Sequence, residues 1–226
     1  MANKNAKGAQ QQEKVIETVS KSEQFYNENK KVIWGCVIAL AVIALAILGY
    51  RKFIYEPKAA EAAAQLFPSE ASYQLGEFEL ALEGDGNNMG FKDIISEYGK
   101  KAGQAIYYYA GTSCLNLGQY EDAIKYLKKY HGKDDLMSSR ALMALGDAYV
   151  GLDDNASAQK AWAKALKVNK ELAFNASILM KMGLQYEEAG QFDKAIECYK
   201  KIEDDYPQSV EAYDVAKYIT RIETAR

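Results

Sequence analysis

The sequence predicts an all-α protein in which a single N-terminal transmembrane helix precedes a solenoid of helix-turn-helix repeats. The main observation is a block of two small residues and one large apolar residue that recurs three times with constant spacing. Its members are Gly111, Ala123 and Leu127, then Gly146, Ala158 and Trp162, then Gly183, Ala195 and Tyr199. The other two observations are a run of 19 uncharged residues near the amino terminus and a content of only three prolines, which suits long helices.

The spacing of the block is what two packed antiparallel helices require. The glycine and the alanine let the two backbones approach, and the large residue fills the space between them. Successive glycines lie 35 and 37 residues apart, which is a period typical of stacked helix pairs. Unrelated helices with coincidental alanines are the alternative. Stacks of this kind bind proteins far more often than they catalyse reactions.

A turn signature of glycine, any residue and an aromatic residue supports the same division. It starts at Gly118 and Gly190, and once more upstream at Gly76. The middle turn departs from it, since it reads Asp153-Asp154-Asn155, and the upstream copy has Ser69 in place of the packing glycine. We therefore expect three good repeats and one degenerate repeat over residues 59–207. A C-terminal cap helix is expected within 208–226, with Val215, Ile219 and Ile222 on its inner face.

At these positions the chain resembles the tetratricopeptide repeat (TPR) proteins. In the register of that family, the packing positions also include Leu142, Leu179, Tyr149 and Tyr186. The resemblance implies a superhelical stack whose inner groove binds other proteins. The TPR proteins that hold acidic chaperone tails would require lysine and asparagine where this chain has Tyr108 with Thr112, so that carboxylate-binding activity is not expected.

Residues 32–50 carry no charge and are predicted to form the transmembrane helix. A helix of this length spans about 28 Å, close to the hydrocarbon thickness of a bilayer. Trp34 and Tyr50, near its ends, suit the membrane interface. A cleaved signal peptide fits less well, because about 30 polar residues precede the run. Residues 51–58, with Pro57, are expected to form a juxtamembrane joint.

Residues 1–31 are predicted to be a polar segment that is disordered over its first dozen residues. Val15, Ile16, Val19, Phe25 and Tyr26 recur at roughly helical spacing there, which indicates an amphipathic helix near the membrane surface or a small docking segment. Residues 1–58 hold 9 basic and 5 acidic side chains, a net charge of +4, whereas residues 59–226 hold 19 and 26, a net charge of −7. The acidic repeats are therefore poor candidates for binding nucleic acid.

The sequence supplies no catalytic residue, cofactor site or metal site, so we expect a non-enzymatic protein without a small-molecule substrate. No nucleophile-elbow, zinc-protease or phosphate-loop motif occurs. His131 lies at a predicted helix end, and Cys36, Cys114 and Cys198 lack metal-ligand spacing and are interpreted as small apolar residues. The loop Asp85–Gly90 partly imitates a calcium loop but lacks the terminal glutamate, so helix-breaking turn residues are the simpler interpretation and its role stays open.

The inner groove is the candidate binding site. Its predicted lining, from the inward positions of the three good repeats, is Tyr108, Thr112, Leu115, Arg140, Met143, Asp147, Met180, Leu184 and Glu187. Methionine-rich surfaces adapt to apolar or unfolded segments. Packing of Met143 and Met180 against the adjacent repeat is an equally good interpretation.

The order of polar amino terminus, uncharged span and repeats resembles the bacterial membrane-anchored TPR proteins of the YfgM type, ancillary subunits of the Sec translocon. This resemblance implies an inner-membrane protein with its amino terminus in the cytoplasm and its repeats in the periplasm. It also implies Sec subunits, periplasmic chaperones or exported clients as protein partners. The lysine and arginine counts alone, four before the span and three after it, leave the orientation open. A structural subunit of a secretion complex and a regulatory protein that signals through its amino terminus are the alternatives, and neither the client nor the oligomeric state follows from the sequence.

Overall fold

The computed structural model describes the backbone of residues 2–225 and the side chains of residue 23 and residues 25–225. The chain divides into two compact units, one ending at Pro57 and one beginning at Lys58. The expected apolar face of Val15, Ile16 and Val19 lies outside the described side chains. The amphipathic character and the disorder of this segment stay predictions.

The first unit consists of helix α1 (Ala2–Tyr50) and the π-helical turn η1 (Arg51–Tyr55). Among the described residues, one helical run, Phe25–Gln74, is long and apolar enough to cross a membrane, and its most apolar window has a mean hydropathy of 2.8. Apolar side chains around its circumference are exposed within the unit, including Val32, Leu40 and Leu45 at 66–68%. A helix that is apolar on all sides requires an apolar surrounding.

Residues 51–58 are helical. The N–H of Glu56 donates to the carbonyl of Arg51, five residues back, before α2 (Glu56–Gln74) begins. Pro57 has no N–H to donate and its ring crowds the preceding turn, and a widened π-helical turn relieves such crowding. The joint expected at 51–58 is therefore a π-turn followed by the start of α2.

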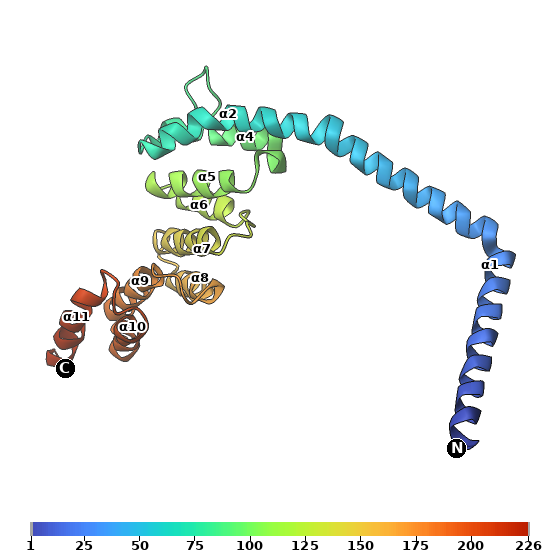
Figure 1. Ribbon diagram of the computed structural model, residues 1–226. Helices are drawn as coiled ribbons and strands as arrows, with labels where there is room; N and C mark the ends of the chain where they lie inside the picture. Colours follow the sequence, from blue (N-terminus) through green and yellow to red (C-terminus); the bar gives the residue numbers. More distant parts are fainter. Residues whose placement is uncertain (1, 226) are drawn as a thin grey trace. The chain divides into compact units, whose positions relative to one another are not determined.

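The second unit is a stack of helices that follow one another in chain order (Figure 1). After α2 come α3 (Phe78–Glu83), α4 (Phe91–Tyr98) and the 3₁₀ turn η2 (Gly99–Ala102). Three helix pairs follow: α5 (Ala105–Asn116) with α6 (Tyr120–Leu127), α7 (Asp135–Val150) with α8 (Asn155–Val168), and α9 (Asn175–Glu188) with α10 (Phe192–Asp205). Helix α11 (Ala212–Thr224) ends the stack. Residues 2–225 contain no named strand, so the predicted all-α class is confirmed.

The recurring block makes the predicted close contacts. A Cβ atom placed on Gly146 would lie 2.3 Å from Nε1 of Trp162, and one on Gly183 would lie 2.4 Å from Cε1 of Tyr199. At Gly111 the nearest atom is Cγ of Leu127, at 2.6 Å. Each glycine therefore faces the large residue of its own block, and any side chain would collide with it.

The turns inside the four helix pairs share one backbone hydrogen bond, in which an N–H donates to the carbonyl five residues earlier. The pairs are Glu77 with Ser72, Gln119 with Cys114, Asp154 with Tyr149, and Gln191 with Tyr186, at 2.8–2.9 Å. This bond characterises a Schellman cap, which needs a left-handed residue just before the donor. Gly76, Gly118 and Gly190 supply it, whereas Asp153 adopts φ 59° in the middle repeat. Aspartate is among the few side chains that tolerate this conformation.

The first repeat is degenerate in the predicted way. Its second helix, α3, stops at Glu83, and Ser69, in place of the packing glycine, donates its hydroxyl to the carbonyl of Met89 at 2.5 Å. In the intervening loop, Oδ1 of Asp85 accepts the backbone N–H groups of Asn87 and Asn88 at 2.8 and 2.6 Å. These hydrogen bonds hold the pKa of Asp85 below its usual value. The carboxylate thus serves a turn, as the simpler interpretation of this loop expected.

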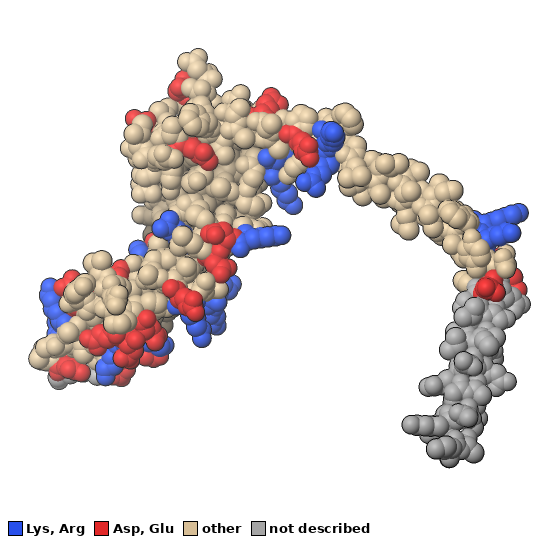
Figure 2. Space-filling model, viewed as in Figure 1, with Lys and Arg blue, Asp and Glu red and all other residues tan. Residues whose placement is uncertain are grey.

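The core of the repeats consists of three clusters. The first extends from α2 to α7 and includes Leu82, Phe91 and Ile106. The second surrounds Trp162, Ile178 and Cys198, and the third joins α9, α10 and α11 through residues such as Tyr199, Ile202, Val215 and Ile222. Val215 and Ile222 are buried and Ile219 packs against them, so α11 covers the end of the stack as predicted. On the face shown in Figure 2, charged side chains are denser around α10 and α11 than over α2 and α4.

Candidate functional site

The predicted groove begins with a cluster of tyrosines on α2 and α5. The ring of Tyr73 lies 5.0 Å from that of Tyr109, and Tyr108 lies 5.8 Å from Tyr109 and 6.4 Å from Tyr130. Helix α5 itself carries no charged residue. We call these four residues the tyrosine cluster. Sequence reasoning found only Tyr108 of this cluster, because Tyr73 belongs to the degenerate repeat and Tyr130 follows α6.

The tyrosine cluster is uncharged. Burial raises the pKa of Tyr108, and the neighbouring Tyr73 raises it further while Arg140 opposes the shift. Burial also raises the pKa of Tyr109, with a contribution from Glu70. Both phenols therefore stay protonated at neutral pH. The cluster offers apolar ring faces and neutral hydroxyl groups, which suit apolar or weakly polar chain segments.

The other two predicted groove residues of α5 are less accessible. Thr112 is only 7% exposed, and its hydroxyl lies 3.0 Å from that of Tyr73 and donates to the carbonyl of Tyr108 at 2.8 Å. Leu115 is half-buried against the first core cluster. Thr112 thus fixes the position of Tyr73.

The predicted groove residues of α7 and α9 carry most of the charge, and much of it is paired. Asp147 forms an ion pair with Lys181 at 3.2 Å, which links these two helices. Glu187 accepts two hydrogen bonds from Nη2 of Arg221, at 2.6 and 2.8 Å, and one from the hydroxyl of Tyr199 at 3.1 Å. The guanidinium of Arg140 lies 6.0 Å from the ring centre of Phe174. Glu187 is therefore engaged by the cap helix α11.

The predicted apolar groove residues of α7 and α9 lie partly in the core and partly at the surface. Met143 is half-buried against the cluster around Trp162, and its carbonyl accepts the indole N–H at 3.1 Å. Met180 is half-buried against the cluster around Tyr199. Both methionines thus contact the core and retain an exposed part, whereas Leu184 is 41% exposed.

Asp147 has a pH-dependent effect on stability. Burial raises its pKa, and the opposing charge of Lys181 only partly offsets this shift. The folded state therefore binds a proton more readily than the unfolded state, so the contribution of Asp147 is most favourable below its ordinary pKa and is lost as the pH rises through the raised value. We expect Asp147→Asn to change stability at pH 7 by less than about 1 kcal/mol, because the pair is partly exposed.

The measurement is the melting temperature of both proteins between pH 7 and pH 4. On acidification, the wild type should gain stability relative to Asp147→Asn. The control is Asp122→Asn, which removes the carboxylate of an exposed pair with Lys125 at 3.5 Å and leaves Asp147 in place. An unchanged difference between wild type and Asp147→Asn across this range would contradict the assignment.

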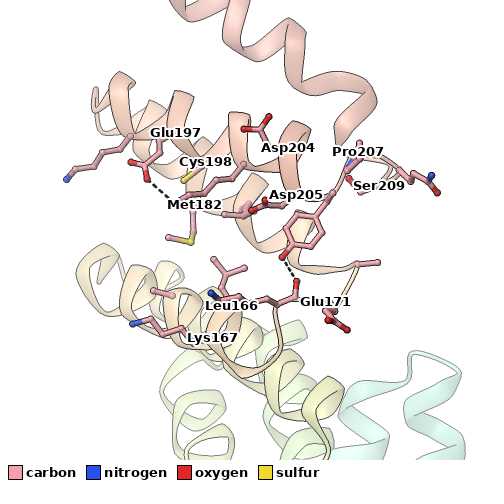
Figure 3. A pocket seen from close by; sticks show the side chains of 18 of the residues that line it. Leu166, Lys167, Glu171, Met182, Glu197, Cys198, Asp204, Asp205, Pro207 and Ser209 are labelled. Carbon is pink, nitrogen blue, oxygen red and sulfur yellow. Dashed lines mark hydrogen bonds and ion pairs between the residues drawn. The ribbon is translucent and has the colours of Figure 1, made fainter.

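A cleft that sequence reasoning did not predict lies between α8 and α10 (Figure 3). Its volume is about 1510 Å³, and we call it the outer cleft. Helices α8, α9 and α10 line it, together with the connection before α9 and residues 206–209. Met182 and Cys198 lie at its centre. Burial raises the pKa of the Cys198 thiol to about 11, so this thiol is not an activated nucleophile at neutral pH.

The paired helices, their shared turns and the glycine contacts define a protein made of stacked helical repeats. Tetratricopeptide repeat models match residues 105–130 and 143–210. The chain therefore carries tetratricopeptide repeats, and repeats of this class serve chiefly as protein-binding surfaces.

Two crystal structures of MamA resemble the chain. One has 23% sequence identity, covers 74% of this chain and 83% of its own, and gives a TM-score of 0.56. The second has 24% identity, covers 70% of this chain and 88% of its own, and gives a TM-score of 0.54. At this level of identity they support the repeat fold. No curated protein matches the sequence. The narrower resemblance to the YfgM type stays a prediction.

Proposed function

We propose that the protein is a non-enzymatic, membrane-tethered scaffold whose inner groove docks apolar or partly unfolded segments of other proteins. The tyrosine cluster carries this proposal. It joins the rings of Tyr73 on α2, Tyr108 and Tyr109 on the uncharged helix α5, and Tyr130 after α6. Tyrosines contribute large contact areas at a small entropic cost and are common at interaction hot spots.

The charge distribution favours apolar segments over acidic tails. Asp147 and Lys181 neutralise each other, and Glu187 is bound by Arg221. Arg140 remains as an exposed cation beside the tyrosine cluster, with its guanidinium stacked near Phe174. Phosphate- and carboxylate-binding sites usually contain at least two basic residues. A single arginine therefore does not make the groove a typical site for acidic tails.

The uncharged span 32–50 supports tethering to a bilayer. A tether raises the local concentration of the groove where client chains emerge, so individually weak contacts can suffice. On the resemblance to the YfgM type, we place the protein in the bacterial inner membrane, with the amino terminus in the cytoplasm and the repeats in the periplasm. Its proposed place is a protein-export or envelope-assembly site, with Sec subunits, periplasmic chaperones or exported chains as partners.

The test is site-specific photo-crosslinking of the full-length protein in native membranes. A crosslinking residue at position 108 or 143 should capture export components or exported chains, whereas one at Tyr213, which is 83% exposed on α11, should not. Tyr108→Glu should reduce capture from position 143 by about thirtyfold, since losing a hot-spot aromatic costs about 2 kcal/mol. Tyr213→Glu is the matched control and should leave capture unchanged.

Three outcomes would contradict the proposal. Equal capture from positions 108 and 213 would show that the groove is not the binding site. Capture of one stoichiometric envelope subunit alone would favour a fixed structural component. Protection of the repeats from external protease in spheroplasts would show that they do not face the periplasm.

A further inference from the structure

The outer cleft is separate from the inner groove and has an apolar floor. Leu179, Met182 and Cys198 form part of this floor and are 5–9% exposed. Small-molecule pockets usually enclose about 300–1,000 Å³. At about 1510 Å³, the outer cleft is larger and suits a polypeptide segment better.

One end of the cleft is acidic. Asp204 and Asp205 lie in the last turn of α10, which contains no basic residue, and Glu171 lies across from them (Figure 3). The carboxyl end of a helix carries a partial negative charge, so carboxylates there are unfavourable unless a cation is near. Two aspartates at this position indicate that the end of α10 is suited to a cationic partner.

None of the ion pairs among the described residues includes Asp204, Asp205 or Glu171, although Lys201 attracts Asp205 from one turn earlier. Lys201, one turn before Asp205, pairs with Glu197 at 2.9 Å, and Lys194 lies 5.3 Å from the ring centre of Tyr186. Lys167 and Lys170 also line the cleft, and Lys170 directly precedes Glu171 in the connection before α9. Four lysines and four carboxylates line the cleft as a whole, and three of these carboxylates, Glu171, Asp204 and Asp205, lie at the end of α10.

The acidic end is held in place by hydrogen bonds between the α8–α9 connection and the end of α10. The hydroxyl of Tyr206 donates to the carbonyl of Lys170 at 2.7 Å. The fully buried Asn175 donates through Nδ2 to the hydroxyl of Tyr206 at 3.2 Å and to the carbonyl of Asn169 at 2.9 Å. These bonds fix the α8–α9 connection to the end of α10. A preformed site loses less conformational entropy when a partner binds.

We propose that the outer cleft is a second docking site, for a partner protein segment in which apolar side chains are followed by basic ones. The apolar side chains cover Met182 and Cys198, and the basic side chains lie against Asp204, Asp205 and Glu171. Electrostatic complementarity then sets the direction in which the segment lies along the cleft. This site operates independently of the inner groove.

The test uses full-length protein in detergent and two fluorescent ten-residue peptides. Both begin with six leucines and alanines; one ends in arginines and glycines, the other in glutamates and glycines. Fluorescence anisotropy should show binding of the arginine peptide about tenfold tighter than of the glutamate peptide. Asp204→Lys with Asp205→Lys should weaken binding of the arginine peptide about tenfold and strengthen binding of the glutamate peptide.

The matched control is Glu203→Lys with Glu223→Lys, which makes the same change in net charge at exposed positions that do not line the cleft. It should change the affinity by less than about twofold. Ala163→Trp, which fills the cleft from α8, should weaken binding of both peptides while circular dichroism confirms the fold. Equal affinity for the two peptides, an equal loss in the control, or full binding by Ala163→Trp would each overturn the proposal.

Discussion

Gly146→Ala is expected to destabilise the repeats by about 2 kcal/mol, although the same change at an open helix position stabilises by about 1 kcal/mol. The new Cβ would lie 2.3–2.8 Å from three atoms of the Trp162 indole. That ring is 3% exposed and donates to the carbonyl of Met143, so it cannot move without losing this hydrogen bond. Overpacking of a rigid core side chain costs about 3 kcal/mol at the upper end of its usual range, which outweighs the gain in helix propensity. Urea unfolding of the full-length protein in detergent, followed by circular dichroism, measures the change.

Two further variants test whether the cost comes from the contact between position 146 and Trp162. At Gly111 the facing residue is Leu127, which is smaller than tryptophan and has no side-chain hydrogen bond to lose, so Gly111→Ala should cost less than Gly146→Ala. In a Trp162→Leu background, Gly146→Ala should also cost less, because the smaller side chain makes room. A stabilising effect of Gly146→Ala, or an equal cost in both backgrounds, would show that the glycine is not needed for close packing.

Removal of residues 210–226 is the second change with a large expected effect. It deletes α11 and exposes the fully buried Tyr199 and Ile202. The burial of Val215 and Ile222, which belong to α11, is lost as well. Burying two such aliphatic side chains contributes about 3–6 kcal/mol, so the third repeat is expected to unfold at a much lower temperature. Glu187 also loses Arg221 as its partner.

Hydrogen exchange followed by mass spectrometry can locate this loss. Amide protons of α9 and α10 should exchange rapidly in the truncated protein, whereas those of α5 and α6, in the first core cluster, should keep their protection. Removal of residues 225 and 226 alone is the control and should change neither region. Uniform loss of protection across α5 to α10 would contradict a local capping role for α11.

The fold could be predicted largely from the sequence because it rests on short-range rules. The spacing of Gly146, Ala158 and Trp162 specifies one helix pair, and the same spacing in the other blocks specifies the stack. Among the four turns, the middle one alone lacks the glycine of the turn signature. Asp153 adopts the required left-handed conformation, and the side chain of Asp154 accepts the N–H of Ser157 at 3.0 Å to begin α8.

The candidate sites were harder to predict because they depend on how neighbouring repeats are spaced. The sequence placed Tyr108 in the groove but gave no sign that Tyr73 covers Thr112 or that Arg221 reaches back to Glu187. The outer cleft depends on the separation of α8 and α10, which no repeat position encodes. A single anomaly was visible beforehand, namely two aspartates at the end of a helix that contains no basic residue in its last turn.

The shared turn has a consequence for how the number of repeats in such proteins changes during evolution. Its defining hydrogen bond joins backbone groups only, in all four copies from Glu77 to Gln191. The main sequence requirement of the turn is therefore one residue that adopts a positive φ, and aspartate meets this requirement in place of glycine in the middle repeat. Duplication of one repeat would carry its own turn with it and leave the neighbouring turns unaltered. The number of repeats, and with it the length of the binding surface, can thus change by gene duplication without a new connection having to evolve.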